Sequence, residues 1–204
     1  MSPRRAAALR GGDVSLRDHL IATAERMIAE RGSAGLTVRA IAREAGVADG
    51  VLYNHFSDKE ELLAHALNAH VGSVERTLGD LPEPGTATVA ENLHTHIEHG
   101  LALHRAILPA MAGFLSQPEV LARFSDMHGN GTGDWRDRLR DYLHTEQELG
   151  RLASDAKVDA AASMIVGVCH ETVLGLLFQA IASPPAPERL DDLITAVLDG
   201  IGLR

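Results

Sequence analysis

The sequence contains very little cysteine and few aromatic residues. Of its 204 residues, Cys169 alone is a cysteine, and Phe, Tyr and Trp together make up 3% of the chain. A single thiol excludes an intrachain disulfide and fits a reducing compartment. The scarcity of large rings, combined with a hydrophobic content of 45%, indicates an aliphatic and alanine-rich core. Such a core suits packed helices better than a β-sandwich.

Targeting and membrane signals are also lacking. No window reaches the roughly 18 consecutive apolar residues that a transmembrane helix needs. Residues 1–15 contain arginines, but the apolar run that follows them is too short for a signal peptide. We therefore expect a soluble, cytoplasmic protein with no membrane partner.

Positive charge is in the minority, and its distribution is uneven. The net charge is −9. Residues 1–60 contain nine Lys and Arg against eight Asp and Glu, whereas residues 61–204 contain ten against twenty. The acidic second part disfavours contact with a polyanion, and the nearly neutral first part does not. If the protein binds nucleic acid, we expect the contact within residues 1–60.

Hydrophobic periodicity predicts helices through most of the chain, and no strand or internal repeat is found. Ser15 and Thr37 are placed to cap two of the helices, and Gly46 is placed to end the second. The segment 79–85, rich in Pro and Gly, interrupts the helical pattern. The predicted fold class is therefore all-α.

Three features of the second part bear on its packing. Pro109 lies inside a long helical segment, which it is expected to kink or split. The segments 155–182 and 187–203 are apolar helices, and the first is expected to be buried all round. Two such helices at the end of a chain favour pairing with a second copy across a two-fold axis.

The most informative segment extends from Leu36 to Leu63. It predicts a helix from Thr37, a glycine turn, a short helix near Asp49–His55, and a third helix opened by a Ser-x-x-Glu capping box at Ser57. Leu52 and Phe56 are expected to anchor the short helix to the core. Two short helices at this spacing are typical of a helix-turn-helix, whose second helix enters the DNA major groove.

This segment resembles the TetR family of bacterial one-component transcriptional regulators. The resemblance covers about residues 15–67 and rests on TVRAIAREAGV at 37–47, GVLYNHF at 50–56 and SDKEELL at 57–63. It implies a helix-turn-helix DNA-binding domain at residues 1–56 and a helical effector-binding and dimerisation domain at 57–204, with a linking helix from 57. It also implies a repressor, rather than an enzyme, that a small-molecule effector releases from a palindromic operator.

The predicted DNA contacts lie on the short helix and beside it. By family resemblance, Tyr53, His55 and Lys59 contact the DNA backbone, and Lys59 shares a phosphate with the free N–H groups of its helix. Arg39 is expected to reach a guanine edge or a phosphate. The full set is Arg39, Asp49, Gly50, Val51, Tyr53, Asn54, His55 and Lys59.

Two residue groups near these contacts have more than one interpretation. Ala48 stands where the family often has a capping Ser or Thr, so Asp49 is expected to cap the short helix instead. Arg4, Arg5 and Arg10 form either a solvated tail or an arm that follows the DNA backbone or the minor groove.

The candidate effector contacts are polar and large apolar side chains of the second part. Buried polar groups need partners, so these either bond to each other or to water, or line an effector pocket. Core packing explains the apolar members equally well. Effector binding near Pro109 is expected to tilt the helix that starts at Ser57, and so to change the separation of two recognition helices. The full set is His104, Met111, Phe114, Phe124, Trp135, His170, Glu171 and Phe178.

Two other classes of function remain open at this point. The histidines at 94, 96, 99 and 104 suggest a small metal-dependent enzyme, although the His170-Glu171 pair is not completed to a zinc-protease motif, because position 174 is Leu. A helical interaction module without DNA binding is the other alternative. Cys169 is interpreted as a small core residue. We expect no cofactor and no metal.

Overall fold

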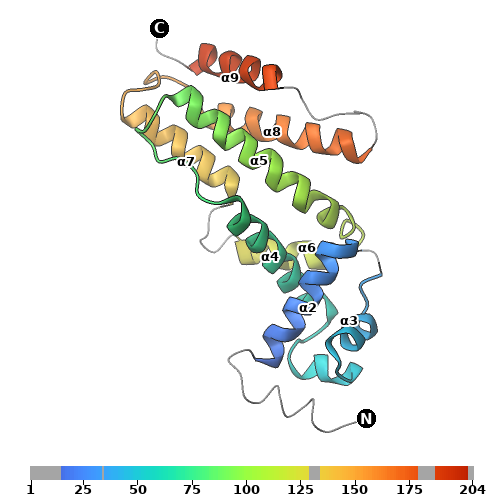
Figure 1. The fold of residues 1–204 in the computed structure, drawn as a ribbon. Coiled ribbons are helices and arrows are strands. Elements are labelled where there is room, and N and C mark those ends of the chain that lie inside the picture. Colours follow the sequence, from blue (N-terminus) through green and yellow to red (C-terminus); the bar gives the residue numbers. More distant parts are fainter. Residues whose placement is uncertain (1–14, 34, 129–133, 179–186, 202–204) are drawn as a thin grey trace. The chain divides into compact units, whose positions relative to one another are not determined.

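The computed structural model describes residues 15–33, 35–128, 134–178 and 187–201. Within these ranges every regular element is a helix, as the sequence predicted (Figure 1). The arm that carries Arg4, Arg5 and Arg10 lies outside the described residues. So do residues 179–182 and 202–203, where the two apolar C-terminal helices were expected to end.

The described residues form two compact units, which lie within Met1–Ser73 with Pro109–Met127, and within Val74–Leu108 with His128–Arg204. Helices α4 (Lys59–Leu78) and α5 (Val89–Ala112) each contribute residues to both units. The proposed functional division at residue 56 stays a prediction.

The first unit contains the elements of the predicted helix-turn-helix. These are α2 (Leu16–Arg31), α3 (Val38–Ala45) and the 3₁₀ helix η1 (Asp49–Asn54), together with the beginning of α4, the end of α5 and α6 (Pro118–His128). Their apolar faces meet in one core. Its fully or almost fully buried members include Leu20, Ala24, Ile41, Leu52, Phe56, Leu63, Leu67, Phe114 and Val120.

Local capping explains where the first helices begin and end. The Ser15 hydroxyl accepts from the backbone N–H of Asp18 at 3.2 Å, and the Thr37 hydroxyl accepts from that of Ala40 at 3.1 Å. Gly46 closes α3 with a left-handed φ of 73°, a conformation that glycine adopts without a steric penalty. These three predictions are confirmed.

The second unit is a bundle of long helices around an aliphatic core. It contains most of α5, α7 (Trp135–Glu148), α8 (Val158–Leu177) and α9 (Pro187–Ile201), and α5, α7 and α8 run side by side in Figure 1. Their shared core includes Leu93, Ile97, Leu101, Trp135, Leu139, Leu143, Ile165, Cys169, Leu190, Ile194 and Val197.

Pro109 does not split its helix. Helix α5 continues through Pro109 to Ala112, although the division between the two units falls at this residue. A proline inside a helix removes one backbone hydrogen bond, to the carbonyl of the residue four positions earlier. The remaining residues of the last turn keep their helical conformation, so the helix is not split at Pro109, and a kink there stays a prediction.

Helix α8 departs from its prediction in two respects. It begins at Val158 rather than near 155, and it is not buried all round, because Ala160, Met164, Gly167, Glu171 and Leu174 form an exposed stripe along one side.

Helix α8 is also long and apolar enough, by length and composition, to cross a membrane, contrary to the sequence expectation. Residues Val158–Leu176 have a mean hydropathy of 1.2. This segment is 44% buried inside the chain, where it forms part of the core of the second unit. Such a composition is therefore accounted for by a core helix.

Gly100 allows Trp135 to pack closely against α5, and we predict that replacing this glycine is costly. A Cβ atom at Gly100 would lie 2.2 Å from a ring carbon of Trp135. Because Trp135 is itself buried, Gly100→Ala should lower the free energy of unfolding by about 1–3 kcal/mol, as overpacked cores do. Urea denaturation measures this change.

Gly200→Ala is the matched control, because a Cβ atom there meets nothing within 4 Å. It should be neutral or slightly stabilising, since alanine favours a helix more than glycine does. Equal effects of the two substitutions would contradict the close contact with Trp135.

Candidate functional site

One side of the short helix η1 is buried in the core of the first unit, and the other side is exposed to solvent. Leu52 and Phe56 are 2% and 3% exposed and lie in the core of the first unit, as predicted. Tyr53, between them, is 60% exposed. The element therefore presents the Tyr53 hydroxyl to solvent on a rigid support.

The structure places all eight predicted DNA contacts in the first unit, on α3, on η1 with the residue after it, and at the start of α4. Five of them are exposed to solvent and three are half-buried. The exposed residues are Arg39, Asp49, Gly50, Tyr53 and Asn54, and the half-buried ones are Val51, His55 and Lys59. Their contact with DNA stays a prediction.

Asp49 does not cap the short helix, which corrects the sequence interpretation. Because η1 begins at Asp49, the capping position belongs to Ala48, which makes no side-chain capping bond. The Asp49 carboxylate instead lies 3.2 Å from Nε of Arg39 on α3. This ion pair joins two of the predicted contacts and leaves the terminal nitrogens of Arg39 directed to solvent, since that side chain is 88% exposed.

The capping box of α4 lies one residue later than predicted. Asp58 Oδ1 accepts from the backbone N–H of Glu61 at 2.8 Å, and Glu61 Oε2 accepts from the backbone N–H of Ser57 at 2.7 Å. The pair is therefore Asp58 with Glu61, rather than Ser57 with Glu60. The Ser57 hydroxyl donates to the same Glu61 oxygen at 2.8 Å.

Helix α6 and the residue before it are tied to this end of α4 by two side chains, Arg123 and Gln117, that sequence analysis did not identify. Both guanidinium Nη atoms of Arg123 donate to the Asp58 carboxylate, one of them at 2.7 Å. Lys59 Nζ donates to Oε1 of Gln117 at 3.2 Å. The hydrogen bonds from Arg123, followed by that from the Glu61 N–H, lower the pKa of Asp58. Arg123 lies 65 residues from Asp58, so no local signal marks the pair.

Arg17 forms a second tie to α4, from α2. Its Nη2 atom lies 3.2 Å from Glu61 Oε1 and 2.8 Å from the Nε2 atom of His65. The guanidinium also lies over the Phe56 ring, with its carbon 4.8 Å from the ring centroid. Burial, followed by the charge of Arg17, lowers the pKa of His65 and keeps it neutral beside the guanidinium.

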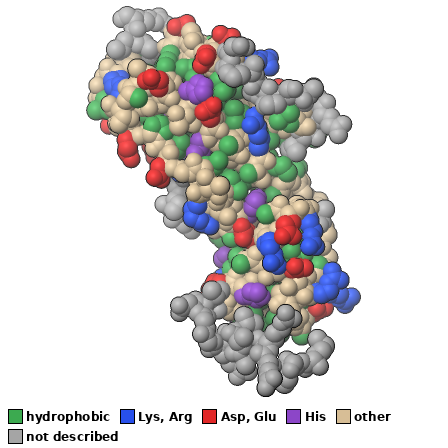
Figure 2. Space-filling view, viewed as in Figure 1, with side chains coloured by type: hydrophobic (Ala, Val, Ile, Leu, Met, Phe, Trp, Pro, Cys, Tyr) green, Lys and Arg blue, Asp and Glu red, His purple; other side chains and the backbone are tan. Residues whose placement is uncertain are grey.

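Charges of both signs are mixed on the first unit. Figure 2 shows Lys and Arg side chains interleaved with Asp and Glu over α2 and α3. Arg26 on α2, for example, pairs with Glu44 on α3 at 3.2 Å. This agrees with the near-neutral charge of residues 1–60, and it means that any phosphate contact depends on individual residues rather than on a broad basic patch.

Three of the predicted effector contacts meet in the second unit. His104 lies on α5, Trp135 begins α7 and His170 lies on α8. The His104 ring centroid is 5.3 Å from that of Trp135 and 4.6 Å from that of His170. His104 Nδ1 is 2.5 Å from the Gly100 carbonyl oxygen. Burial lowers the pKa values of both histidines, which favours their neutral forms.

The other five predicted effector contacts lie elsewhere. Met111, Phe114 and Phe124 belong to the apolar core of the first unit, and Phe178 is 77% exposed. Glu171 is exposed and faces a groove rather than His170. The role of all eight residues in effector binding stays a prediction, and the structure groups His104 with Trp135 and His170.

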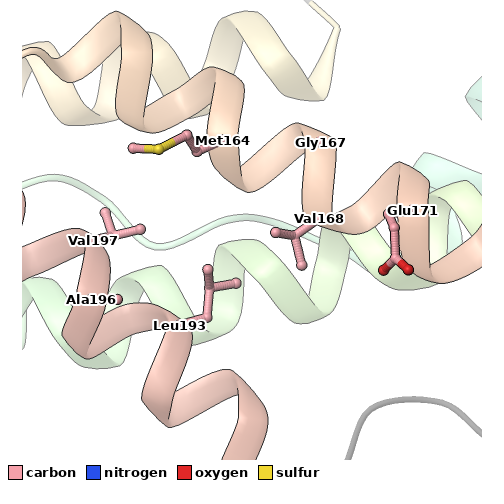
Figure 3. A pocket seen from close by; sticks show the side chains of 7 residues that line it. All are labelled: Met164, Gly167, Val168, Glu171, Leu193, Ala196 and Val197. Carbon is pink, nitrogen blue, oxygen red and sulfur yellow. The ribbon is translucent and has the colours of Figure 1, made fainter.

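A groove of about 410 Å³ separates α8 from α9. Figure 3 shows its lining, to which α8 contributes Met164, Gly167, Val168 and Glu171 and α9 contributes Leu193, Ala196 and Val197. Val168 and Leu193 point toward each other across it. Apart from Glu171, this surface is apolar.

The fold gives the surroundings of the histidines considered as metal ligands and of the single cysteine. Among the described residues, no three His, Cys, Asp or Glu side chains gather closely enough to hold a metal ion. Cys169 is buried, and burial raises the pKa of its thiol to about 12. A thiol in that state is unreactive, which supports its interpretation as a core residue.

Family comparisons match both parts of the chain. Residues 20–66 match the model of bacterial regulatory proteins of the tetR family. Residues 87–200, more than half of the chain, match the model of the C-terminal domain of AefR-like transcriptional repressors.

Individual relatives fall into two groups. The HTH-type transcriptional repressor KstR2 of Mycolicibacterium smegmatis is 45% identical over 53 residues, which is 26% of either chain. The alignment thus covers about a quarter of that relative. The HTH-type transcriptional repressor AcnR of Corynebacterium diphtheriae is 24% identical over 91% of this chain and 90% of its own.

Solved structures share the fold along nearly the whole chain. The transcriptional regulator FadR of Bacillus subtilis, in complex with stearoyl-CoA, has a TM-score of 0.59 and 24% identity, covering 89% of this chain and 95% of its own. The flavonoid-responsive regulator FrrA has a TM-score of 0.66 and 23% identity, covering 92% and 97%.

We predict that Asp58 stabilises the first unit both as a cap and as an ion-pair partner. Asp58→Ala removes both functions and should lower the free energy of unfolding by about 1–2 kcal/mol. Asp58→Asn keeps a capping oxygen and loses the charge that Arg123 binds, so its cost should be below about 1 kcal/mol. Urea denaturation measures both.

Asp80→Ala is the control, because it removes an exposed carboxylate outside the helices. Its effect should stay within about 0.5 kcal/mol. An Asp58→Ala protein as stable as the parent would rule out the cap.

Proposed function

Because the chain belongs to the TetR family of bacterial regulatory proteins, we propose that it is a repressor that binds a palindromic operator and is released by a small-molecule effector. Members of this family are DNA-binding transcription regulators rather than enzymes, and nothing found supports the metal-dependent enzyme considered from the sequence. The cytoplasm is the proposed location.

The observation that best supports the proposed DNA contact is the mounting of η1. Leu52 and Phe56 anchor it, Tyr53 is 60% exposed, and Lys59 follows in the first turn of α4. In the proposed complex the Tyr53 hydroxyl, the Lys59 ammonium and free N–H groups of α4 hold DNA phosphates.

Base recognition is proposed for the exposed side of the same element. Arg39 directs its terminal guanidinium nitrogens to solvent while Asp49 holds its Nε. A guanidinium oriented in this way suits the O6 and N7 atoms of a guanine. Val51 suits a thymine methyl group, and Asn54 suits an adenine edge.

We propose dimerisation through α8 and α9. The exposed stripe on α8 includes Met164, which is 54% exposed, and Leu174, which is 39% exposed. It continues into the apolar groove beside α9. A second copy placed on this surface across a two-fold axis forms a four-helix interface and presents two recognition elements to two half-sites about 34–36 Å apart.

Effector binding is proposed for the second unit, near His104, Trp135 and His170. The relative FadR was solved with stearoyl-CoA and FrrA is flavonoid-responsive, so binding of small molecules is known within this fold. A ligand that prefers the released form by about 3 kcal/mol weakens DNA binding on the order of 100-fold. Titrating the protein–DNA complex with a ligand measures this change, and an unaltered affinity contradicts the release mechanism.

Substitution of the phosphate contacts tests DNA binding. A duplex enriched by the protein from a random pool serves as the operator, and fluorescence anisotropy measures its affinity against salt concentration. Lys59→Ala should weaken binding and reduce the slope of log affinity against log salt by about one, because one phosphate contact is lost. Tyr53→Phe should weaken binding about fivefold, the equivalent of one hydrogen bond.

Lys157→Ala is the matched control, since Lys157 is the chain's other lysine and lies exposed before α8. It removes the same charge from the second unit and should leave the affinity and the slope unchanged. Unchanged affinity in both Lys59→Ala and Tyr53→Phe would remove the proposed phosphate contacts.

The proposed dimer is tested by placing a charge on the exposed stripe of α8. Met164→Glu should weaken dimerisation on the order of 100-fold or more, because a carboxylate would be buried in an apolar interface. Sedimentation equilibrium measures the change. Leu149→Glu is the control, because Leu149 is also 54% exposed and lies outside α8 and α9. A Met164→Glu protein that stays dimeric would rule out this interface.

A further inference from the structure

Arg39 and Asp49 form an ion pair on the exposed side of the helix-turn-helix. Arg39 is the second residue of α3, and Asp49 is the first residue of η1. Nε of Arg39 donates to Oδ2 of Asp49 at 3.2 Å. Both residues belong to the predicted DNA contacts, so the pair places an acidic group on the surface that is proposed to meet a polyanion.

The core of the first unit fixes the backbones that carry the pair. Ile41 and Ala42 of α3 are fully buried, and Leu52 of η1 is 2% exposed. Between the two helices, the backbone N–H of Val47 donates to the Ala42 carbonyl oxygen at 2.9 Å. The fold therefore sets the separation of the two side chains, and the pair joins the helices across the turn.

Folding stability gives little reason for the Asp49 carboxylate. The Arg39 side chain is 88% exposed and that of Asp49 is 50% exposed, and exposed ion pairs contribute little to folding. Asp49 does not cap η1 either, because the capping position belongs to Ala48. DNA phosphates repel the carboxylate, so it lowers the affinity for any duplex. A cost of this kind is typical of a residue that improves discrimination between partners.

The hydrogen bond with Asp49 limits the contacts that Arg39 can make. A guanidinium has five N–H groups, one on Nε and four on the two Nη atoms. With Nε engaged, a bidentate contact must use the end of the fork that carries Nη1 and Nη2. Guanine presents two acceptors in the major groove, O6 and N7, which such a fork matches, whereas adenine presents N7 beside an amino donor.

The same carboxylate disfavours a contact between Arg39 and a phosphate. The pair of Arg39 and Asp49 has no net charge, so it gains little from the negative potential of the DNA backbone. A phosphate against the guanidinium would also lie close to the carboxylate, and like charges repel. A guanine edge is uncharged and accepts both hydrogen bonds without this repulsion. The pair therefore favours a base over the backbone, a choice that the sequence left open.

We propose that Asp49 is a positioning residue that determines specificity, because it holds Arg39 for one guanine in each half-site of the operator and keeps it from the phosphates. Asp49 acts through Arg39 rather than by the direct DNA contact expected from the sequence. This inference rests on the proposed DNA binding and specifies how the site selects a base. An ion pair without a role at the DNA is the competing explanation.

Base preference at the contacted position tests the proposal. The duplex that the full chain enriches from a random pool serves as the operator. Fluorescence anisotropy measures the affinity for this duplex and for variants with each other base at each position. Arg39→Ala should abolish a preference for guanine at one position of each half-site, where the parent prefers guanine on the order of tenfold or more. If Arg39→Ala changes no base preference, the proposal fails.

Asp49→Ala should change base preference and affinity in opposite directions. At the position identified with Arg39→Ala, the preference for guanine should fall to about threefold or less, because Arg39 loses the group that holds it. Affinity for a duplex of unrelated sequence should rise about threefold or more, since a negative charge leaves the surface. The slope of log affinity against log salt should steepen by about one, because the released guanidinium binds a phosphate.

The double variant separates positioning from direct contact. In an Arg39→Ala background, Asp49→Ala should cause no further change in base preference at any position, because Asp49 acts only through Arg39. A preference that Asp49→Ala alters in this background would show a base contact made by Asp49 itself, and the proposal would be overturned.

Glu44→Ala is the matched control. Glu44 lies on α3 and pairs with Arg26 of α2 at the same distance of 3.2 Å, outside the predicted contacts. Its removal deletes the same charge from the same unit and should leave every base preference unchanged. Two results contradict the role of Asp49: an Asp49→Ala protein that keeps the preference of the parent, and a Glu44→Ala protein that loses it equally.

Failure of this inference is distinguishable from failure of the proposed function. If no duplex is enriched, or if Lys59→Ala and Tyr53→Phe bind as the parent does, the proposed DNA contacts fail and this inference fails with them. If those two variants bind more weakly while Asp49→Ala keeps the preference for guanine, only the role of Asp49 is overturned.

Discussion

The carboxylate of Asp58 is the interaction on which the arrangement of the first unit depends most. One of its oxygens caps α4 through the Glu61 N–H, and both oxygens receive the guanidinium of Arg123 from α6. The cap holds the Asp58 carboxylate at the first turn of α4. The ion pair with Arg123 then holds α6 beside that turn. The beginning of α4, where Lys59 and the free N–H groups lie, is consequently held by α6 as well as by its own core residues.

The same end of α4 is joined to α6 and to the residue before it. Helix α6 follows α5 in sequence, and α5 and α4 each have residues in both units. Arg123 on α6 donates to Asp58, and Gln117, the residue before α6, accepts from Lys59. An ion pair of this kind has little intrinsic stability, since exposed pairs contribute about 1 kcal/mol or less. The ion pair therefore matters mainly because it joins α6 to the end of α4 that carries the proposed phosphate contacts.

The second unit contains a large apolar core. Its core is aliphatic and closely packed, with Trp135 against Gly100. It also leaves one side of α8 exposed, along a stripe that is apolar apart from Glu171. The proposed second copy packs on this stripe.

Sequence by itself determined the features that depend on neighbouring residues. Ser15, Thr37 and Gly46 delimit helices because each bonds with, or turns, the backbone within a few positions. The anchoring of η1 by Leu52 and Phe56 followed from helical spacing alone. The same local reasoning misplaced the capping box of α4 by one residue. It also assigned Asp49 to a cap, whereas the Asp49 carboxylate pairs with Arg39 on α3. His104, Trp135 and His170 were predicted as members of a larger set of effector contacts, and their contact with one another was not predicted.

Tertiary structure decided what depends on distant residues. Arg123 and Gln117 meet α4 across 65 and 58 residues, and periodicity carries no information about which charged side chains will pair at such a separation. Likewise, His96 entered the sequence analysis as a possible metal ligand, and only the packing of α5 against α7 brought its ring to 4.5 Å from that of Tyr142. Helix propensity and capping act over one or two turns of backbone, whereas the partners of a buried polar atom are chosen by the fold as a whole.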